Sequence, residues 1–286
     1  MGLKIEFLGT GGAMTIPRPL CRCRVCEEAR KKGVPYSRTG PGVFVHGPNV
    51  LIDTSEDIYL QLNRSAIAKI NAVFYSHWHP DHVMGRIILE SLNADWRNYP
   101  PNHQQTDVYL PEQVAADFQE RLGSGEHLQF FASQGYIQLH HLKDGDRVTI
   151  NGTEIFPFRL AEDYVYAFLF TEQDKRVLIA PDELNDWNPP PSLKGIDLAV
   201  LPIGLFEYHP ITGERLLSAE DPVLNTECTF AETIEIIKAL GPKKTILTHI
   251  EEMNQLGFDD LKVVEKRLKK DGLNIDIAYD TLIVEV

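Results

Sequence analysis

The stretch YSHWHPDHVMG, residues 75–85, decides how this sequence is interpreted. It follows the apolar residues NAVF and places four metal-binding side chains within six residues: His77, His79, Asp81 and His82. Imidazole nitrogens and carboxylate oxygens are good ligands for zinc, and they also suit iron and manganese. Side chains two residues apart on an extended segment face the same way, so the first two histidines can hold one metal ion. The other two ligands follow the bend at Pro80 and can hold a second ion, and this density of ligands argues against a solvated loop that is rich in histidine by chance.

The composition of the 286-residue chain limits the classes of fold and function. With 43% hydrophobic residues, the chain can bury a sizeable core in one domain or two. The formal net charge of −13 argues against broad binding to nucleic acid or to an anionic membrane, because both need a basic surface. A small anionic substrate remains compatible, because bound metal ions would be the largest local charges.

The sequence also indicates where the protein works. No run of about eighteen apolar residues occurs, so we expect no membrane span. The N-terminal segment MGLKIEFLGTGG lacks the long apolar core of a signal peptide, so we expect a cytoplasmic protein. A homodimer stays open.

The spacing of apolar residues predicts strands followed by helices in both halves of the chain. In the first half we expect strands within residues 3–10, 41–55 and 70–76. We expect helices within residues 24–33, 55–67, 82–93 and 111–123, the second of them with Ser55 as its N-cap. Residues 97–105 are expected to form a loop. In the second half we expect strands and hairpins over 136–183, a strand in 190–204, a helix at 229–241, a strand at 243–250, a helix at 258–272 and two short strands. Two halves that each combine a sheet with helices would suit a four-layer αββα sandwich in one domain, residues 1–286.

Several motifs together resemble the metallo-β-lactamase superfamily. SHWHPDHVMG resembles its H-x-H-x-D-H signature, and IEFLGTGGA is similar to the opening strand and loop of its phosphodiesterase and tRNA-processing branches. NVLIDTSEDI resembles the family strand that here ends in Asp53. VLIAPDE resembles the strand whose aspartate bridges two metals, and TILTHIEE resembles the strand that carries the last metal histidine. The resemblance implies an α/β, αββα fold in which Asp182 bridges the two ions. It also implies that His249 joins Asp81 and His82 in the second metal site.

Three of the four cysteines form the cluster CRCRVC, residues 21–26. In a cytosolic chain such a cluster more often indicates metal or redox chemistry than a disulfide framework. Its position resembles the structural zinc site of the phosphoribosyl cyclic phosphodiesterase branch, and a similar cluster occurs in the branch of the PQQ biosynthesis hydroxylase. Cys21, Cys23 and Cys26 supply three thiolates, and a structural zinc needs a fourth ligand. The phosphodiesterase branch has a histidine as this fourth ligand, where this chain has Glu251 and Glu252. We therefore predict that the more distant Cys228 is the fourth ligand here. The alternative is three reduced cysteines that bind no metal.

Two family positions differ in this chain. The resemblance implies a further metal histidine before the strand of Asp182, but Ala161 occupies its place, next to Glu162 and Asp163. We therefore expect the site of His77 and His79 to be the less complete of the two. It could be completed by Glu162 or Glu227, or it could stay empty.

The second departure concerns the proton donor. Glu227, in TECTFAET, stands where relatives often have a histidine as the general acid. A glutamate can donate a proton where burial raises its pKa. It could instead ligate a metal, or simply be a carboxylate that is favoured at a helix start. His209, in FEYHP, follows a strand and is a further candidate for the catalytic pocket.

These features predict metal-dependent hydrolysis of a phosphodiester or a cyclic phosphate. Divalent ions (zinc, manganese or iron) would activate a water molecule and neutralise charge on the phosphoryl group, with Glu227 as the proton donor. Two alternatives stay open. One is an iron-type oxygenase or redox enzyme on the same fold, since two histidines and a carboxylate also form non-haem iron sites. The other is a degenerate member that binds a ligand or one ion without turnover.

Overall fold

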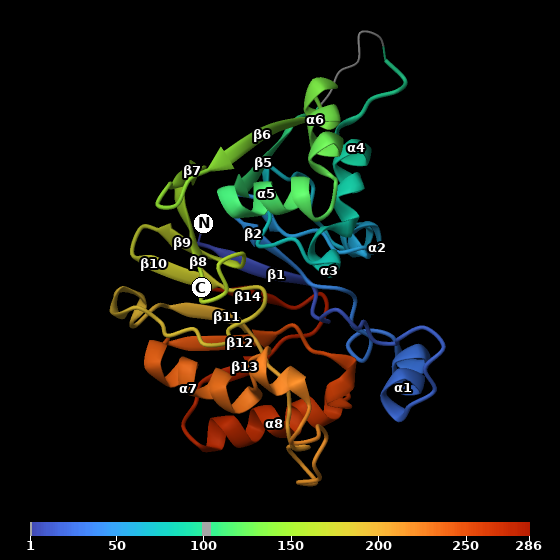
Figure 1. The fold of residues 1–286 in the computed structure, drawn as a ribbon, viewed down its shortest axis with the longest axis vertical. Helices are drawn as coiled ribbons and strands as arrows, with labels where there is room; N and C mark the ends of the chain where they lie inside the picture. Colours follow the sequence, from blue (N-terminus) through green and yellow to red (C-terminus); the bar gives the residue numbers. More distant parts are fainter. Residues whose placement is uncertain (1, 99–103) are drawn as a thin grey trace.

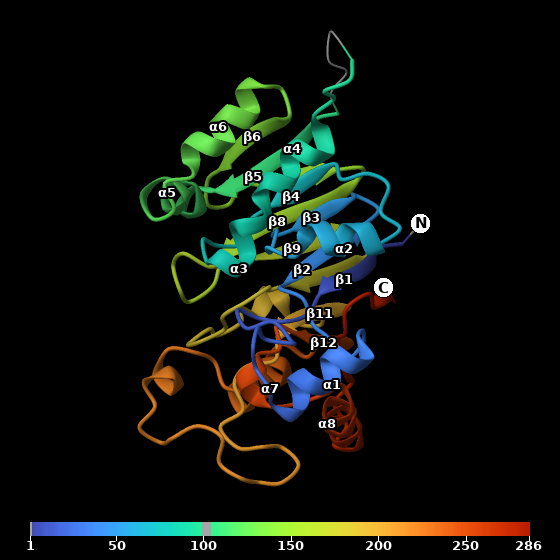
Figure 2. The same cartoon turned by 90° about the vertical axis from the view of Figure 1, so that its right-hand side faces the viewer.

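The computed structural model describes residues 2–98 and 104–286. Two seven-stranded sheets lie face to face, in the orders β14-β1-β2-β3-β4-β5-β6 and β13-β12-β11-β10-β9-β8-β7. Helices α2 to α6 cover the outer side of the first sheet, and α7 and α8 cover that of the second (Figures 1 and 2). The predicted αββα sandwich is therefore confirmed.

The first sheet and its helices come mainly from the first half of the chain. Its strands are β1 (Lys4–Gly9), β2 (Gly42–His46), β3 (Val50–Ile52), β4 (Ala72–Phe74), β5 (Thr106–Pro111), β6 (Ile137–Leu142) and the C-terminal β14 (Ile283–Glu285). The helices that cover it are α2 (Ile58–Arg64), α3 (Pro80–Val83), α4 (Ile88–Asn93), α5 (Glu112–Glu120) and α6 (Gly125–Ser133), whereas α1 (Arg24–Lys32) lies outside the layers. Because β14 pairs with β1, the two ends of the chain lie in the same sheet.

The second sheet uses the second half of the chain. Its strands are β7 (Val148–Ile150), β8 (Thr153–Arg159), β9 (Tyr166–Glu172), β10 (Lys175–Ile179), β11 (Leu198–Pro202), β12 (Lys244–Thr248) and β13 (Ile275–Ile277). The helices are α7 (Phe230–Leu240) and α8 (Phe258–Lys270), and the short 3-10 helices η2 (Pro191–Leu193), η3 (Pro222–Asn225) and η4 (Glu252–Asn254) lie in connections. Helix α7 begins with a capping box between Thr229 and Glu232 and ends at Gly241, whose φ of 55° is left-handed.

One continuous core fills the space between the sheets. It combines side chains of the first sheet, such as Phe7 and Phe74, with side chains of the second, such as Phe168 and Phe170, all of them fully buried. Burial of this apolar surface is the main force that holds the two sheets together. The assignment of residues 1–286 to a single domain stays a prediction. No helix in the described ranges is long and apolar enough to cross a membrane.

Most predicted elements are present, and the differences are local. Helix α2 begins after Asp57 rather than after Ser55, and α6 was not predicted. The helix predicted at 82–93 is divided into α3, the 3-10 helix η1 (Met84–Ile87) and α4. The predicted loop at 97–105 lies mostly outside the described residues.

Gly85 explains why that helix is divided. Its backbone N–H donates to the Thr54 carbonyl oxygen at 2.9 Å, so the chain after the histidine-rich loop lies directly against the turn after β3. A β-carbon at Gly85 would overlap the Ser55 carbonyl oxygen and the Ile58 side chain. We expect Gly85→Ala to lower the free energy of unfolding by about 1–3 kcal/mol, the usual cost of overpacking.

Chemical denaturation of both the variant and the wild type measures this difference. Ile87→Ala is the matched control, because Ile87 lies two residues further along and its side chain is 48% exposed. Equal stability of the Gly85→Ala variant and the wild type would contradict the close contact.

Candidate metal centre

Asp53, directly after β3, holds the histidine-rich loop in place. Its carboxylate accepts hydrogen bonds from Ser76 N at 2.7 Å, Ser76 Oγ at 2.6 Å and His82 Nδ1 at 2.7 Å. All three residues are buried. Because Asp53 accepts the hydrogen of His82 Nδ1, Nε2 is the nitrogen that would bind a metal ion in place of a proton.

The fold brings together all six side chains that the sequence predicted as ligands of the active-site metals. They form two groups, the first with His77, His79 and Asp182, and the second with Asp81, His82 and His249. Within each group, the candidate ligand atoms lie within 4.8 Å of one another. The groups are assembled from the loop after β4, the turn after β10 and the end of β12, so residues from both sheets meet here.

Asp182 lies between the two groups. Its Oδ2 is 3.3 Å from His77 Nε2, and its Oδ1 is 3.5 Å from His249 Nε2. Its Oδ2 also lies 3.6 Å from His82 Nε2, so this one carboxylate faces ligands of both groups. This is the position that a bridging ligand of two metal ions would take.

The donor atoms fit divalent ions. His77 Nε2 is buried and makes no hydrogen bond, although it faces the other ligands. His82 Nε2 lies only 3.3 Å from His249 Nε2. Two imidazole nitrogens this close need a proton or a metal ion between them, because their lone pairs would otherwise repel each other. Four imidazoles and two carboxylates suit zinc, manganese or iron.

The charges in the centre support the same conclusion. Burial works against ionisation of Asp182, yet the imidazoles of His249 and His77 hold its pKa well below the ordinary value. Burial lowers the pKa of His79 to about 4, helped by the neighbouring His77. Burial opposes the charge on His249 as well, but Asp182 and Asp81 raise its pKa to about 9. At neutral pH, Asp182 is therefore anionic and His79 neutral, and a metal ion would replace the proton of His249.

The backbone is also unusual here. Asp53, Glu183 and His249 all adopt left-handed conformations, with φ of 61°, 27° and 53°. Such conformations cost about 1–3 kcal/mol and are found mainly at functional sites. The strained positions therefore coincide with the anchor of the histidine-rich loop, the neighbour of Asp182 and the candidate ligand His249.

Nothing replaces the missing family histidine as a ligand within the described residues. Ala161 is exposed, and neither Glu162 nor Glu227 belongs to either ligand group. Tyr164 lines the same cleft, with its ring centroid 5.7 Å from that of His79. The first group therefore keeps two histidines and one carboxylate, as the sequence predicted.

Glu227 lies in the cleft as predicted, next to a second glutamate that sequence analysis missed. Glu183 and Glu227 both line the pocket beside Asp182 and His249. Burial raises the pKa of Glu183 to about 9, and the adjacent carboxyl group of Glu227 acts in the same direction. The only sequence signal for Glu183 was its place directly after Asp182.

His209 does not reach the cleft. Its Nδ1 accepts hydrogen bonds from the backbone N–H groups of Ile211 and Thr212, at 3.3 and 3.2 Å. It is not among the residues that line either pocket at the metal centre. The prediction that His209 is catalytic is wrong, because its loop folds back on itself.

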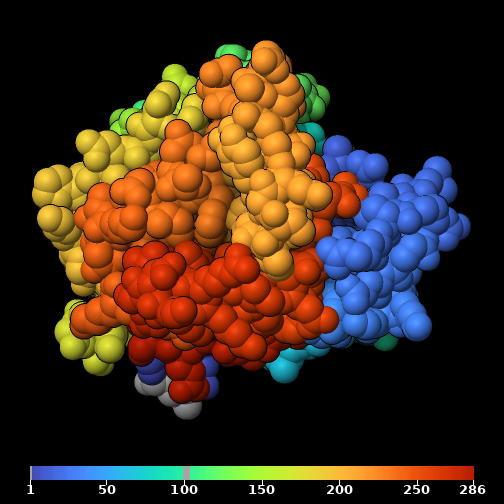
Figure 3. All heavy atoms as spheres, turned by 90° about the horizontal axis from the view of Figure 1, so that it is seen from below, coloured from blue at the N-terminus to red at the C-terminus, as the bar shows by residue number. Residues whose placement is uncertain are grey.

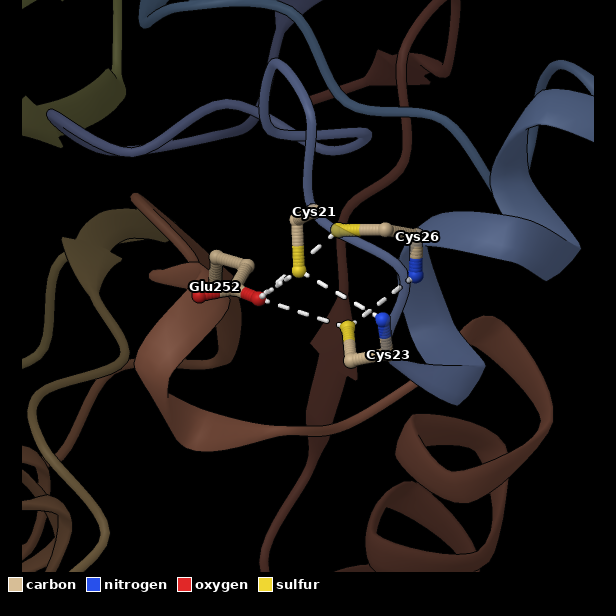
Figure 4. A group of neighbouring side chains, drawn as sticks. All are labelled: Cys21, Cys23, Cys26 and Glu252. Carbon is tan, nitrogen blue, oxygen red and sulfur yellow. Dashed lines mark hydrogen bonds between the residues drawn. The ribbon is translucent and has the colours of Figure 1, made fainter.

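The three cysteines converge with a glutamate (Figure 4). The Oε1 of Glu252, at the start of η4, lies 3.4 Å from the sulfur of Cys21, 3.4 Å from that of Cys23 and 3.7 Å from that of Cys26. Cys228 is elsewhere: its sulfur contacts Thr233 Oγ1 at 3.5 Å, inside the second half. The prediction that Cys228 is the fourth ligand is therefore wrong, and it is the carboxylate of Glu252, in the family's histidine region, that lies beside the three sulfurs.

An open cleft leads to the metal centre. Its walls are Ala13 and Met14 from the opening loop, Tyr164, and a segment from Val223 to Glu227, and Asp182 and His249 lie at its base. Among the lining residues that the structure describes there is no lysine or arginine. Three glutamates outside the ligand groups, Glu183, Glu227 and Glu251, also line it, so the cleft has several acidic residues and no basic one among the lining residues.

Comparison with known proteins gives one family. The profile of the beta-lactamase superfamily domain matches residues 48–250, which include the histidine-rich loop, Asp182 and His249. Ribonuclease Z of Pyrococcus horikoshii is 27% identical over 177 residues, 61% of this chain and 50% of that protein. Ribonuclease Z of Thermococcus sibiricus is 25% identical over 255 residues, 86% of this chain and 74% of that protein. The chain thus spans about half the length of the first of these relatives.

Solved structures show the same fold over the full chain. A diphosphatase from the PhnP family superposes with a TM-score of 0.71, at 24% identity, covering 99% of this chain and 98% of that one. Zinc-bound PqqB from Methylobacterium extorquens superposes with a TM-score of 0.71, at 14% identity, covering 99% of this chain and all of that one. At this identity the likeness concerns the fold.

Proposed function

Because this chain belongs to the beta-lactamase superfamily, we propose that it is a metal-dependent hydrolase of small phosphodiesters. The single observation that carries the proposal is the position of Asp182, whose carboxylate lies between His77 of the first ligand group and His82 and His249 of the second, at the base of an open cleft. Divalent ions bound there would lower the pKa of a water molecule and neutralise the phosphoryl oxygens. The similarity to ribonuclease Z and to a diphosphatase supports chemistry at phosphorus.

The acidic cleft supports a small substrate rather than a nucleic acid. A protein that binds a polyanion places lysine and arginine along its path, and the lining described above has neither. Only the metal centre would attract the phosphoryl group, so a single phosphodiester is the appropriate substrate. The net charge of −13 acts in the same direction.

Hydrolysis of bis(4-nitrophenyl) phosphate tests the proposal. Protein purified without added metal is loaded with zinc, manganese or iron, and metal content and release of 4-nitrophenol are measured together. We expect turnover that depends on the metal and disappears with a chelator. Absence of turnover with every metal, at full occupancy of the centre, would contradict the proposal.

Glu227 is proposed to deliver the proton to the leaving group, since it lines the cleft beside Asp182. We expect Glu227→Gln to lower kcat by about 10²-fold or more for an alkyl leaving group, because general acids contribute about 10²–10⁴-fold. For a nitrophenolate leaving group, which needs no proton, the loss should be small. Parallel assays with the two substrates measure this difference.

Glu235→Gln is the control for this variant, because Glu235 lies on α7 and forms a surface ion pair with Lys238. It should leave both rates unchanged. An equal loss of rate for both leaving groups in Glu227→Gln would show that this glutamate does not donate the proton.

One observation favours a second candidate function. The first group, with His77, His79 and Asp182, is a two-histidine, one-carboxylate set like those of non-haem iron oxygenases. Substrate-dependent oxygen consumption by the iron-loaded protein, without phosphodiester hydrolysis, would support an oxygenase instead.

A further inference from the structure

The segment that carries the cysteines has little apolar surface to hold it. Helix α1 lies outside the layers of the sandwich, and in Figure 3 the N-terminal part of the chain (blue) forms a projection beside the C-terminal part (orange and red). Among the residues that the structure describes, its own cluster of buried hydrophobic side chains has three members, Ile16, Val25 and Ala29. So small a cluster stabilises by a few kcal/mol at most, and small units of this kind usually depend on a metal or a disulfide.

The cysteine cluster has the geometry of a closed metal site. Ligands of a tetrahedral zinc at about 2.0–2.3 Å lie about 3.5–3.8 Å from one another. The distances from Glu252 Oε1 to the three sulfurs, 3.4, 3.4 and 3.7 Å, agree with this spacing. Glu252 is 3% exposed, and its other oxygen lies 3.4 Å from the guanidinium group of Arg18. Arg18 thus holds the carboxylate with Oε1 turned toward the sulfurs.

Each sulfur also accepts one backbone N–H. Arg18 N donates to Cys26, Cys23 N donates to Cys21 and Cys26 N donates to Cys23, at 3.3, 3.5 and 3.4 Å. Such hydrogen bonds stabilise thiolates bound to a metal without occupying the metal's own position. The set of three sulfurs and one oxygen suits zinc.

Glu252 lies in the same short segment as a ligand of the active-site metals. His249, three residues earlier, belongs to the second ligand group. Between them, Ile250 N donates to Thr10 O at 2.8 Å, and the Glu251 carboxylate accepts the N–H groups of Ala13 and Met14 at 2.9 and 3.1 Å. The segment 249–252 and the opening loop that leads to Cys21 are therefore joined along their length.

We propose that Glu252 is the fourth ligand of a zinc ion held by Cys21, Cys23 and Cys26, and that this ion couples to the active site. Zinc at the cysteines fixes the segment 249–252 and the cleft wall at Ala13 and Met14. His249 is thereby held in its ligating position before the second active-site ion binds. Less conformational freedom remains to be lost, so filling the cysteine site strengthens metal binding at the Asp81, His82 and His249 group.

The test compares Glu252→Ala, Glu252→His and the wild type. The cysteine site is followed by bound zinc and, after exchange for cobalt, by the thiolate-to-cobalt charge-transfer absorption. The active site is followed by manganese titration with electron paramagnetic resonance, since manganese prefers nitrogen and oxygen ligands to thiolates. Glu27→Gln is the control, because Glu27 lies next to Cys26 but pairs with Arg22 and Arg30 at the surface.

We expect Glu252→Ala to lose the tightly bound zinc and to weaken manganese binding by about 5- to 150-fold, the usual range of coupling between sites. Glu252→His should restore both properties, and Glu27→Gln should change neither. Zinc affinity and cobalt absorption equal to the wild type in Glu252→Ala would overturn the assignment of this ligand. Loss of zinc with manganese affinity within twofold of the wild type would overturn the coupling.

A second variant serves if the first one is unstable. If Glu252→Ala does not fold, Cys21→Ser at the partly exposed edge of the cluster replaces it, with the same expected losses in both titrations. None of these readouts uses turnover, so failure of the proposed hydrolase activity and failure of this inference are separate results.

Discussion

Asp182→Asn is expected to abolish phosphodiester hydrolysis, with a loss of about three orders of magnitude or more in kcat. The carboxylate faces His77 with one oxygen and His249 with the other, and an amide offers only one oxygen with a weaker charge. Loss of a bridging ligand removes several kcal/mol of charge stabilisation in the transition state, and each 1.4 kcal/mol is about tenfold in rate. Kinetics and elemental analysis of the same samples measure the rate and the number of bound ions.

The control for this variant is Asp186→Asn. Asp186 lies four residues further on, is exposed, and has a φ of 55°, which asparagine tolerates. Its activity and metal content should equal those of the wild type. Full activity of Asp182→Asn with two ions bound would show that the chemistry does not depend on this bridge.

Asp53→Asn is expected to weaken metal binding by about 10- to 100-fold, the usual effect of changing a residue that orients a ligand. Asp53 accepts three hydrogen bonds, from the backbone and hydroxyl of Ser76 and from His82 Nδ1. Asparagine has one acceptor oxygen, so its amide N–H₂ must face either Ser76 N or His82. Facing His82, it favours the tautomer with the proton on Nε2, which blocks the metal position.

Isothermal titration of the metal-free protein with zinc or manganese measures this change. Asp107→Asn is a matched control, since Asp107 also pairs with a histidine, His140, at 2.8 Å but on the surface. That variant should bind metal like the wild type. Unchanged affinity of Asp53→Asn would mean that the loop keeps His82 in place without this carboxylate.

The fold could be predicted because its signals are local. The alternating burial of β8, the Gly241 stop of α7 and the apolar runs of β4, β9 and β11 all lie within or directly beside single elements. The family motif H-x-H-x-D-H then placed these elements in a known architecture. The differences arise where one segment meets another, as at Gly85, whose contact with Ser55 divides a helix that the periodicity alone would continue.

The candidate site was predictable to the extent that its ligands occur in recognisable segments. His77, His79, Asp81 and His82 lie within one loop, and Asp182 and His249 each end a strand with a family pattern. The prediction of Cys228 as a ligand was wrong because it rested on residue type, whereas the positions of the atoms decide which side chains can share a metal ion. The Cys228 thiol is chemically suitable, but its sulfur lies against Thr233. The prediction that His209 reaches the catalytic pocket was wrong for a similar reason. Nothing in the sequence shows that its loop turns back on itself.

The donor atoms of this protein and their spacing along each segment can be read from the amino-acid sequence, because side-chain chemistry and the period of a strand or helix are local properties. Which of these donors meet depends on the folded chain. Glu252 reaches the cysteines across 226 positions of the chain, and Glu183 meets Glu227 across the end of the second sheet. Such pairings depend on the register of neighbouring strands and on the path of the connections across the ends of the sheets. The free energy that stabilises this arrangement comes from burial of the whole core, so it cannot be read from the residues of either partner alone.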